Sequence, residues 1–511
     1  MTGQERTAVV VTERPVPGTP RGYEFPDVER TTLANGLQVL VAPMAGRGLV
    51  TASLTLRHGA GDEPEFLGGA AVLSARALTE GTELRDAIAL VEAGERLGAS
   101  LHAEAGWDAM SAGLDVPASR LVPALELLAE VVRRPAFPAT EVERLRDERL
   151  TDLLQAKADP RRRADEAYVA TIYAPSSPYG RPAGGTAETV VGLGHEALAG
   201  IHAAAMDPSR AAFIVVGDVD PAEVLRTVEA LLGDWRSTAT AASGGIDDSP
   251  AIGARQVHVV HRPGAVQTEI RIGHPALARR NPDFHAVSVM SAILGGLFNS
   301  RLNMNLREEK GYTYGASAGF DMRRARGPFT ARAAVNTDVT VPALQEFLAE
   351  LDRIREAPVT DAELRAARDF LIGVFPLRFE TPGPVAGSLS GLFVHDLPHE
   401  ELTRYRAKIE AVTVEDVLRV AQAHIRPEAA AIVLVGDHSA FGPALDTAGL
   451  TPTHVQRDAG TVSDGPLASP AEDAGPVDND GTGPTAGADD ADLPGSDEPA
   501  DPGTNDDVAA G

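Results

Sequence analysis

The sequence predicts an α+β protein built from two homologous halves, and an internal repeat is the main evidence. A helix start, a proline and a Gly-Asp pair closing an apolar strand occur twice, 219 residues apart: Glu196, Pro208 and Gly217-Asp218 recur as Glu415, Pro427 and Gly436-Asp437. In both halves, hairpin-like strands alternate with groups of amphipathic helices. We therefore expect each half to be an antiparallel sheet covered by helices.

The first half supplies the clearest local signals. Asn35-Gly36 is a turn signal between apolar stretches, so residues 31–43 are expected to form a hairpin. Further strands are expected in segments 49–61 and 211–220. Helical spacing of apolar residues predicts helices at 69–78, 90–97, 121–134, 139–156, 195–205 and 222–232.

Composition sets the expected boundaries. Residues 1–25 form a Pro-rich leader, and the two domains are expected at 26–236 and 254–450. Residues 237–253 are rich in small residues and proline, which is typical of a linker. Residues 456–511 are mostly Asp, Gly, Pro, Ala and Thr, so a disordered acidic tail is expected there, dispensable for stability and binding.

Charge and cysteine content exclude several classes of function. The chain has 511 residues, a net charge of −27 and no cysteine, which excludes disulfides, thiolate nucleophiles and Cys-ligated metals. Fourteen acidic residues and no basic ones follow Arg457, so this segment carries a charge of −14. The rest of the chain carries −27 + 14 = −13, and this negative charge disfavours nucleic-acid binding. No apolar run approaches the ~20 residues of a membrane span, and charges flank the valines near the N-terminus, so a cytoplasmic protein is expected.

The stretch 294–314, LGGLFNSRLNMNLREEKGYTY, contains a candidate binding pair. Its spacing predicts a helix that ends at Gly311, with Arg307 in the last turn and Tyr314 just beyond. A permanently charged guanidinium and a phenol can together hold a peptide carbonyl, or the oxyanion it becomes. Spacing alone favours a structural role instead, with Arg307 paired to a neighbouring Glu and Tyr314 packed in a sheet.

The segments LGGLFNSRL and LREEKGYTYG resemble the second half of the insulinase and pitrilysin family, the inverted zincins, and the resemblance extends from Leu33 to Asp437. It implies two α+β halves that face each other like a clamshell. In this family an Arg and a Tyr at this spacing grip the substrate backbone across a cavity from a zinc ion. Arg307 and Tyr314 match both positions.

The zinc motif of the family is lost in the first half. Active members carry H-x-x-E-H on a helix, framed here by Gly69 and by Gly81-Thr82, but Val72, Ala75 and Arg76 replace its His, Glu and His. The resemblance places the third ligand, a Glu, at Asp152. Val and Ala offer no lone pair and Arg adds a positive charge, so no metal is expected in this chain. We expect Arg76 and Asp152 to form an ion pair in the vacated position.

Other histidine pairs do not replace the lost motif. His258 and His261 lie in a strand-like segment, where positions three apart point to opposite faces. His395 and His399 flank a proline that makes a shared helical face unfavourable. All four are expected to be surface histidines rather than metal ligands.

The resemblance therefore implies a zinc-less, substrate-binding subunit of a two-chain zinc metalloendopeptidase. Zinc is expected in a paralogous partner subunit, with no cofactor in this chain. The substrate is expected to be an unfolded or short peptide that adds as a strand to a sheet edge. Two alternatives stay open: a purely structural subunit of a complex, and an independent peptidase with an unrecognised site.

Overall fold

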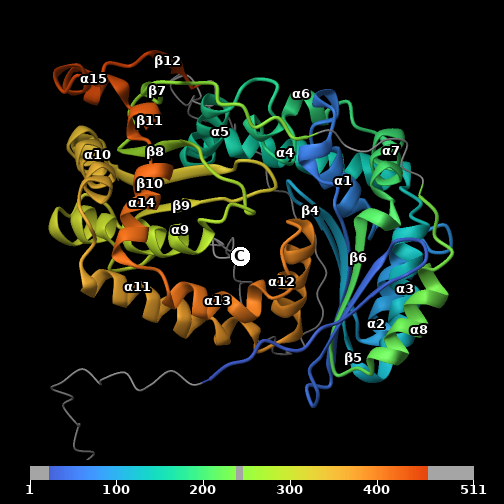
Figure 1. Cartoon of the computed structure of the whole chain (residues 1–511). Helices are drawn as coiled ribbons and strands as arrows, with labels where there is room; N and C mark the ends of the chain where they lie inside the picture. The colour runs from blue at the N-terminus through green and yellow to red at the C-terminus, as the bar shows by residue number, and fades with distance from the viewer. Residues whose placement is uncertain (1–21, 238–244, 459–511) are drawn as a thin grey trace, which may run out of the picture.

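The computed structural model describes residues 22–237 and 245–458 of the chain. It has two halves, each a six-stranded sheet with helices packed against it, which meet at a central seam (Figure 1). The α+β class and the two-half arrangement expected from the sequence are thus confirmed. Most of the predicted leader, the centre of the predicted linker and the tail from residue 459 lie outside the described residues.

The first sheet has the strand order β1-β2-β6-β3-β5-β4. The predicted hairpin is present as β1 and β2, which pair antiparallel across a turn where Gly36 has a φ of 95°, a conformation that glycine adopts without steric cost. The strands are β1 (Glu29–Thr32), β2 (Gln38–Pro43), β3 (Leu49–Leu56), β4 (Ser100–Ala105), β5 (Met110–Pro117) and β6 (Ala211–Gly217).

The second sheet repeats this order as β12-β7-β11-β8-β10-β9. Its inner strands match those of the first sheet position by position, so the repeat seen in the sequence extends to the topology. Only the outermost strand has a different origin, because β12 comes from the end of the second half. The strands are β7 (Gln256–His261), β8 (Gln267–Pro275), β9 (Ala316–Phe320), β10 (Pro328–Asn336), β11 (Ala431–Gly436) and β12 (His454–Arg457).

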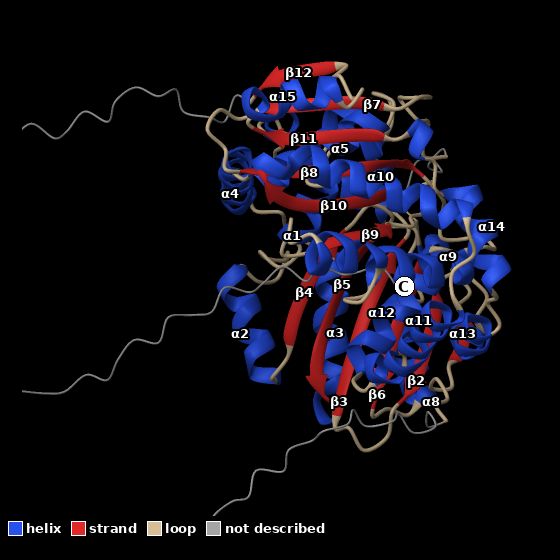
Figure 2. Cartoon of the chain, turned by 90° about the vertical axis from the view of Figure 1, so that its left-hand side faces the viewer, coloured by secondary structure: helices blue, strands red, loops and turns tan. Residues whose placement is uncertain are grey.

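The helices cover the sheets and fill the seam (Figure 2). Those of the first half are α1 (Ala70–Ala77), α2 (Ala87–Leu97), α3 (Leu121–Arg133), α4 (Ala139–Ala158), α5 (Pro160–Ile172), α6 (Ala187–Val190), α7 (His195–Ala205) and α8 (Pro221–Leu232). Those of the second half are α9 (Phe284–Ser291), α10 (Thr340–Glu356), α11 (Asp361–Val374), α12 (Pro382–Val394), α13 (Glu401–Glu410), α14 (Val414–His424) and α15 (His438–Thr447), with π-helical segments η6 (Ala292–Gly296) and η7 (Asn303–Glu309).

The sheets are mixed rather than wholly antiparallel, which corrects the expectation in detail. β2 pairs with β6 in parallel, as β7 does with β11, and β12 also runs parallel to β7. The reason is the connection: β6 and β11 enter their sheets after long helical crossovers, and a crossover, unlike a hairpin, can bring the chain back in the same direction.

The two halves exchange helices across the seam. α12 of the second half packs on β3 and β6 of the first sheet, and α5 of the first half packs on β8 and β11 of the second. Successive residues of β6 consequently belong to different hydrophobic cores. Phe213 lies in the core of the first half, and Ile214 lies in a core that also contains residues of the second half. All seven residues of β6 are buried because both of its faces are covered.

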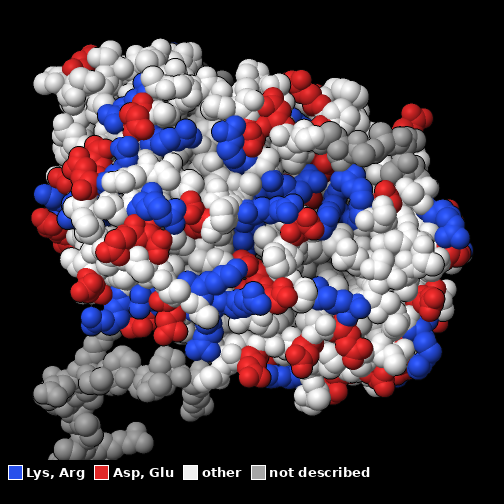
Figure 3. Space-filling view, viewed as in Figure 1, with Lys and Arg blue, Asp and Glu red and all other residues white. Residues whose placement is uncertain are grey.

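Polar contacts also join the halves at the seam, where Lys and Arg side chains gather across the middle of the face in Figure 3. Arg57 on the first half donates to the carbonyl oxygen of Phe393 at the end of α12. Arg324 on the second half lies 2.6 Å from Asp62 and 3.3 Å from Asp108. The seam is therefore held by buried ion pairs as well as by the exchanged helices.

The predicted tail boundary at residue 456 is wrong. Gln456 and Arg457 belong to β12 and pair with β7. Asp458 follows at 3% exposure, with carboxylate oxygens 3.1 Å from Arg262 Nη1 and 3.5 Å from Arg163 Nε. The strand was not predictable from the sequence because four residues on a sheet edge carry too little hydrophobic periodicity to stand out.

Among the described residues, every helix is too short or too polar to cross a membrane.

Candidate functional site

The predicted helix at 69–78 is present as α1, and its start is fixed by a buried carboxylate. Gly69 precedes the helix with a φ of 96°, and Glu63 accepts hydrogen bonds from the backbone N–H groups of Gly69 and Ala71. Burial raises the pKa of Glu63 to about 7, outweighing these bonds and the nearby Arg181, which favour the charged form. The carboxylate thus supplies the cap that no N-terminal side chain provides.

The three positions that replace the zinc motif share one face of α1, since they are three and four residues apart, but they differ in exposure. Ala75 is fully buried, Val72 is half-buried, and Arg76 extends from the helix with its side chain 45% exposed. Arg76 is therefore the one polar and solvent-exposed group among the three.

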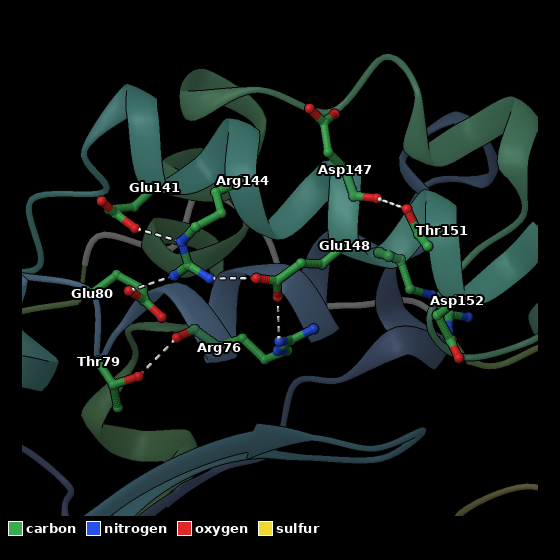
Figure 4. Close-up of polar contacts among 10 residues, drawn as sticks. Arg76, Thr79, Glu80, Glu141, Arg144, Asp147, Glu148, Thr151 and Asp152 are labelled. Atoms are coloured by element: carbon green, nitrogen blue, oxygen red, sulfur yellow. Dashed lines mark hydrogen bonds and ion pairs between the residues drawn. The ribbon is translucent and has the colours of Figure 1, made fainter. Parts of the chain in front are cut away.

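Arg76 is held by a network of charges on α4 (Figure 4). Its guanidinium donates to Glu148 over 3.1 Å, and the other carboxylate oxygen of Glu148 accepts from Arg144 at 2.5 Å. Arg144 is also bonded to Glu141 at 2.8 Å and paired with Glu80 at 2.7 Å. These carboxylates, Glu141 first among them, raise the pKa of Arg144 above its usual range. The network puts a permanent cation where the family resemblance places a metal.

The predicted pair between Arg76 and Asp152 is wrong. Asp152 accepts instead from Arg162 over 2.7 Å and from Arg149, and these two arginines hold its pKa low although burial alone raises it. Glu148 and Asp152 are one helical turn apart on α4, and Glu148 is the one that faces α1. Sequence reasoning chose Asp152 and missed Glu148, which lies 76 residues after Val72.

The residues at this position do not fit a zinc ion. Val72 and Ala75 have no ligand atom, and the guanidinium of Arg76 lies against the carboxylate that is best placed to bind a metal. Across residues 22–237 and 245–458, no group of three or more His, Asp or Glu side chains is arranged to hold a metal. No catalytic step through a metal on this chain follows from the structure.

The other histidines are engaged elsewhere. His258 and His261 lie on β7 as predicted, with His258 Nε2 3.0 Å from Gln256 Oε1 and His261 Nδ1 accepting from the backbone N–H of His438. His399 is exposed. His395 was expected at the surface, but it ends α12 at the seam with a buried Nδ1, and burial lowers its pKa to about 4.

Arg307 lies in η7, the π-helical segment that ends before Gly311 at a φ of 66°. Its guanidinium carbon lies 4.6 Å from the ring centre of Phe298, and its Nε is 3.4 Å from Glu308. The wider turn of a π-helix is often found at functional sites. With 38% of its side chain exposed, Arg307 is positioned by these neighbours but is not enclosed.

Tyr314 is 91% exposed and precedes β9, so the expectation of a tyrosine packed in a sheet is wrong. The neighbouring Thr313 fixes the backbone instead, because its hydroxyl donates to Ala334 on β10 at 2.8 Å. Within the part of the chain that the structure describes, no hydrogen bond or ring contact joins Arg307 to Tyr314. The pair and the α1 position lie in different halves of the chain.

These features define a class of protein: a duplicated peptidase-like fold whose metal position has lost its ligands. A family model described as insulinase, peptidase family M16, matches residues 40–185, and one described as peptidase M16 inactive domain matches residues 193–371. The chain belongs to this family.

Relatives and solved structures agree with this assignment. An uncharacterized zinc protease of Mycobacterium leprae is 26% identical over 79% of this chain and 91% of its own length. A probable mitochondrial-processing peptidase subunit beta of Arabidopsis thaliana is 23% identical over 82% of this chain and 79% of its own. The crystal structure of a peptidase M16 inactive domain from Pseudomonas fluorescens superposes with a TM-score of 0.75 at 26% identity, covering 80% of this chain and 98% of that one.

Proposed function

We propose that this chain is the zinc-less, substrate-binding subunit of a two-chain zinc endopeptidase that acts on peptides. One observation carries the proposal: the Arg76–Glu148 ion pair fills the metal position, whereas Tyr314 stays 91% exposed and Arg307 remains accessible. A chain kept only for packing has little reason to expose a tyrosine so fully. Zinc and the general base belong to a paralogous partner subunit.

The residues of this chain bind and orient the substrate. The guanidinium of Arg307 presents a planar fork of donors to a peptide carbonyl, and its stacking on Phe298 limits its orientation. The hydroxyl of Tyr314 donates a second hydrogen bond to the same oxygen. Both donors strengthen as negative charge develops on that oxygen, which is how an oxyanion hole lowers a barrier.

Sequence similarity supports a paired subunit through one relative, which is named as a subunit of the mitochondrial-processing peptidase. A structural subunit remains the second candidate, because a purely structural Arg307 would make the same contacts with Phe298 and Glu308. We place the proposed complex in the cytoplasm.

Purification of the tagged chain from its native cells tests the proposal. We expect a complex that contains about one zinc ion per pair of chains and cleaves unfolded peptides, while the chain expressed alone contains no stoichiometric zinc and cleaves none. A complex without peptidase activity supports the structural subunit. Zinc and activity in the isolated chain contradict both candidates and indicate an independent peptidase.

A further inference from the structure

A pocket of about 330 Å³ lies at the seam, away from Arg307 and Tyr314. Its floor is a row of side chains in register on three strands: Thr55 of β3, Ser111 of β5 and Glu104 of β4. Ser390 and His395 of the second half form one wall. The volume is at the lower end of the ~300–1,000 Å³ of ligand pockets, which suits one side chain better than a whole ligand.

Arg323 lines the pocket and is fixed in orientation. It is 6% exposed, its Nε donates to Asp321 over 2.8 Å and its Nη2 over 2.5 Å. Its guanidinium carbon lies 4.5 Å from the ring centres of both Trp107 and Tyr179. Nη1 is buried and has no hydrogen-bond partner among the described residues. A buried donor left unpaired destabilises a protein, so an acceptor from a ligand would be bound favourably here.

The other groups of the pocket favour an uncharged ligand. Asp321 neutralises Arg323, and Asp108 is bonded to Arg324 through its side chain and backbone. His395 is neutral near pH 7, with a buried Nδ1 that has no partner among the described residues. An acidic ligand would face the carboxylates of Glu104, Asp108 and Asp321. A basic ligand would face the guanidinium of Arg323, although the exposed Glu104 partly offsets that repulsion.

A carboxamide side chain avoids both repulsions. Its oxygen can accept from Arg323 Nη1, and its NH₂ group can donate to Asp321 or to the ring of His395. Thr55 and Ser390 are already hydrogen-bonded to each other at 3.0 Å, so they shape the pocket rather than compete for the ligand.

An open sheet edge leads to the pocket. β4 is the last strand of the first sheet and has no buried residue, and among the described residues it pairs only with β5. Its unpaired backbone groups can accept an extended peptide as a further strand. The strand ends at Ala105, directly before the turn that lines the pocket, so a peptide along β4 passes the pocket mouth.

The equivalent edge in the second half is covered. A Cβ added to Gly295 of η6 would lie 2.2 Å from the backbone nitrogen of Ala318 on β9. Asn303 accepts from the backbone N–H of Ala316 at 2.9 Å. Both halves therefore have an edge strand at this position, but of the two only β4 is accessible. The pocket lies at the end of β4.

We propose that the seam pocket selects an uncharged carboxamide side chain, Gln or Asn, of a peptide bound along β4. The inference rests on the proposed peptide-binding function and adds a second, specificity-determining contact on this chain.

Fluorescence anisotropy with the full chain in the absence of a partner tests the pocket. The probes are four labelled ten-residue peptides of Ala, Ser and Thr that differ only in a central Gln, Ala, Asp or Lys. We expect the Gln peptide to bind about tenfold more tightly than the Ala peptide, the gain typical of one hydrogen bond to a charged donor. The Asp and Lys peptides should bind no more tightly than the Ala peptide.

Three variants locate the effect. Ser111→Phe fills the pocket from its floor and should abolish the preference for Gln without weakening the Ala peptide. Ser111→Thr is the matched control at the same position and should keep the preference. Arg323→Lys retains the charge but lacks Nη1, so it should lose the preference too. Melting curves establish that each variant is folded.

The outcomes separate the two proposals. Equal affinity of the wild-type chain for all four peptides, or a Gln preference that survives Ser111→Phe, contradicts the pocket and indicates that it holds only water. Peptide binding itself would then still stand. Absence of binding for every peptide contradicts the proposed peptide-binding function and the pocket with it.

Discussion

Two truncations five residues apart separate the docked C-terminal strand from the acidic tail. A chain that ends at Asp458 keeps β12 and the ion pairs of its last residue, whereas a chain that ends at Thr453 loses both. In the shorter chain the guanidinium of Arg262, whose side chain is 14% exposed, loses the carboxylate of Asp458. We expect the longer truncation product to melt like the full chain and the shorter one to be destabilised.

The magnitude follows from the burial of this pair. Removing one partner of a buried ion pair costs about 3–5 kcal/mol. The lower value applies here because Arg262 keeps a second bond, from its Nη2 to the carbonyl of Ala158 at 2.9 Å, and its Nη1 is poorly aligned with Asp458. A loss of about 3 kcal/mol lowers Tm by about 6–12 °C in a domain of this size.

Thermal unfolding followed by circular dichroism measures this difference. Asp458→Asn in the full chain is the matched variant, since it keeps the shape of the side chain and removes its charge. Loss of a hydrogen bond to a charged group costs about 2 kcal/mol, which lowers Tm by about 4–8 °C. The reasoning is refuted if the chain ending at Asp458 melts several degrees below the full chain. It is equally refuted if the chain ending at Thr453 has the same Tm as the full chain.

Three further predictions concern the metal position and the buried histidines. The isolated chain should contain no stoichiometric zinc by elemental analysis, and about one zinc per chain, at a site including Glu148 or Asp152, would overturn this. Arg76→Ala should change the unfolding free energy by less than about 1 kcal/mol, because both partners are 45% exposed; a larger loss in urea titrations would show that the ion pair supports the fold. Burial lowers the pKa of His274 from its ordinary value of 6.5 to about 4. The unfolded chain therefore takes up a proton before the folded one does, and the free energy of unfolding falls as the pH drops from 6.5 to 4. His274→Gln can still accept from the backbone N–H of Arg426, as Nε2 does at 3.0 Å, and should flatten the fall of the unfolding free energy between pH 6.5 and 4; an unchanged slope would show that another group titrates.

Local and periodic features were predictable from the sequence. Asn35-Gly36 specifies a hairpin through its own backbone preferences, and the spacing of apolar residues predicted the helix α1, because both signals act over a few residues. The repeat of Pro208 as Pro427 predicted the shared topology, since duplicated sequences keep their fold. α5 was missed although Asp159-Pro160 is a helix-start signal, and Asp159 does cap it by accepting from Arg161 N–H.

Features set by contacts between distant segments were not predictable. The exchange of α5 and α12 across the seam joins segments that lie far apart in the sequence, such as α12 and β3, and no local pattern records which sheet a helix covers. The same limit explains the choice of Asp152 over Glu148: both are acidic, and the angle between α1 and α4 decides which one meets Arg76. The exposure of Tyr314 depends on how the chain turns into β9, which spacing alone does not reveal.

We propose that Arg307 and Tyr314 act on a reaction whose metal lies on another chain. Steady-state kinetics of the reconstituted two-chain enzyme with Tyr314→Phe tests it most directly, since the substitution removes one donor from an exposed side chain and leaves assembly intact. Loss of one oxyanion-type donor typically lowers kcat on the order of 100-fold, with KM less affected. Arg307→Lys should also impair turnover, because an ammonium lacks the planar fork. We predict a complex that assembles normally and turns over far more slowly, whereas cleavage at the wild-type rate with Tyr314→Phe would mean that this chain is a scaffold.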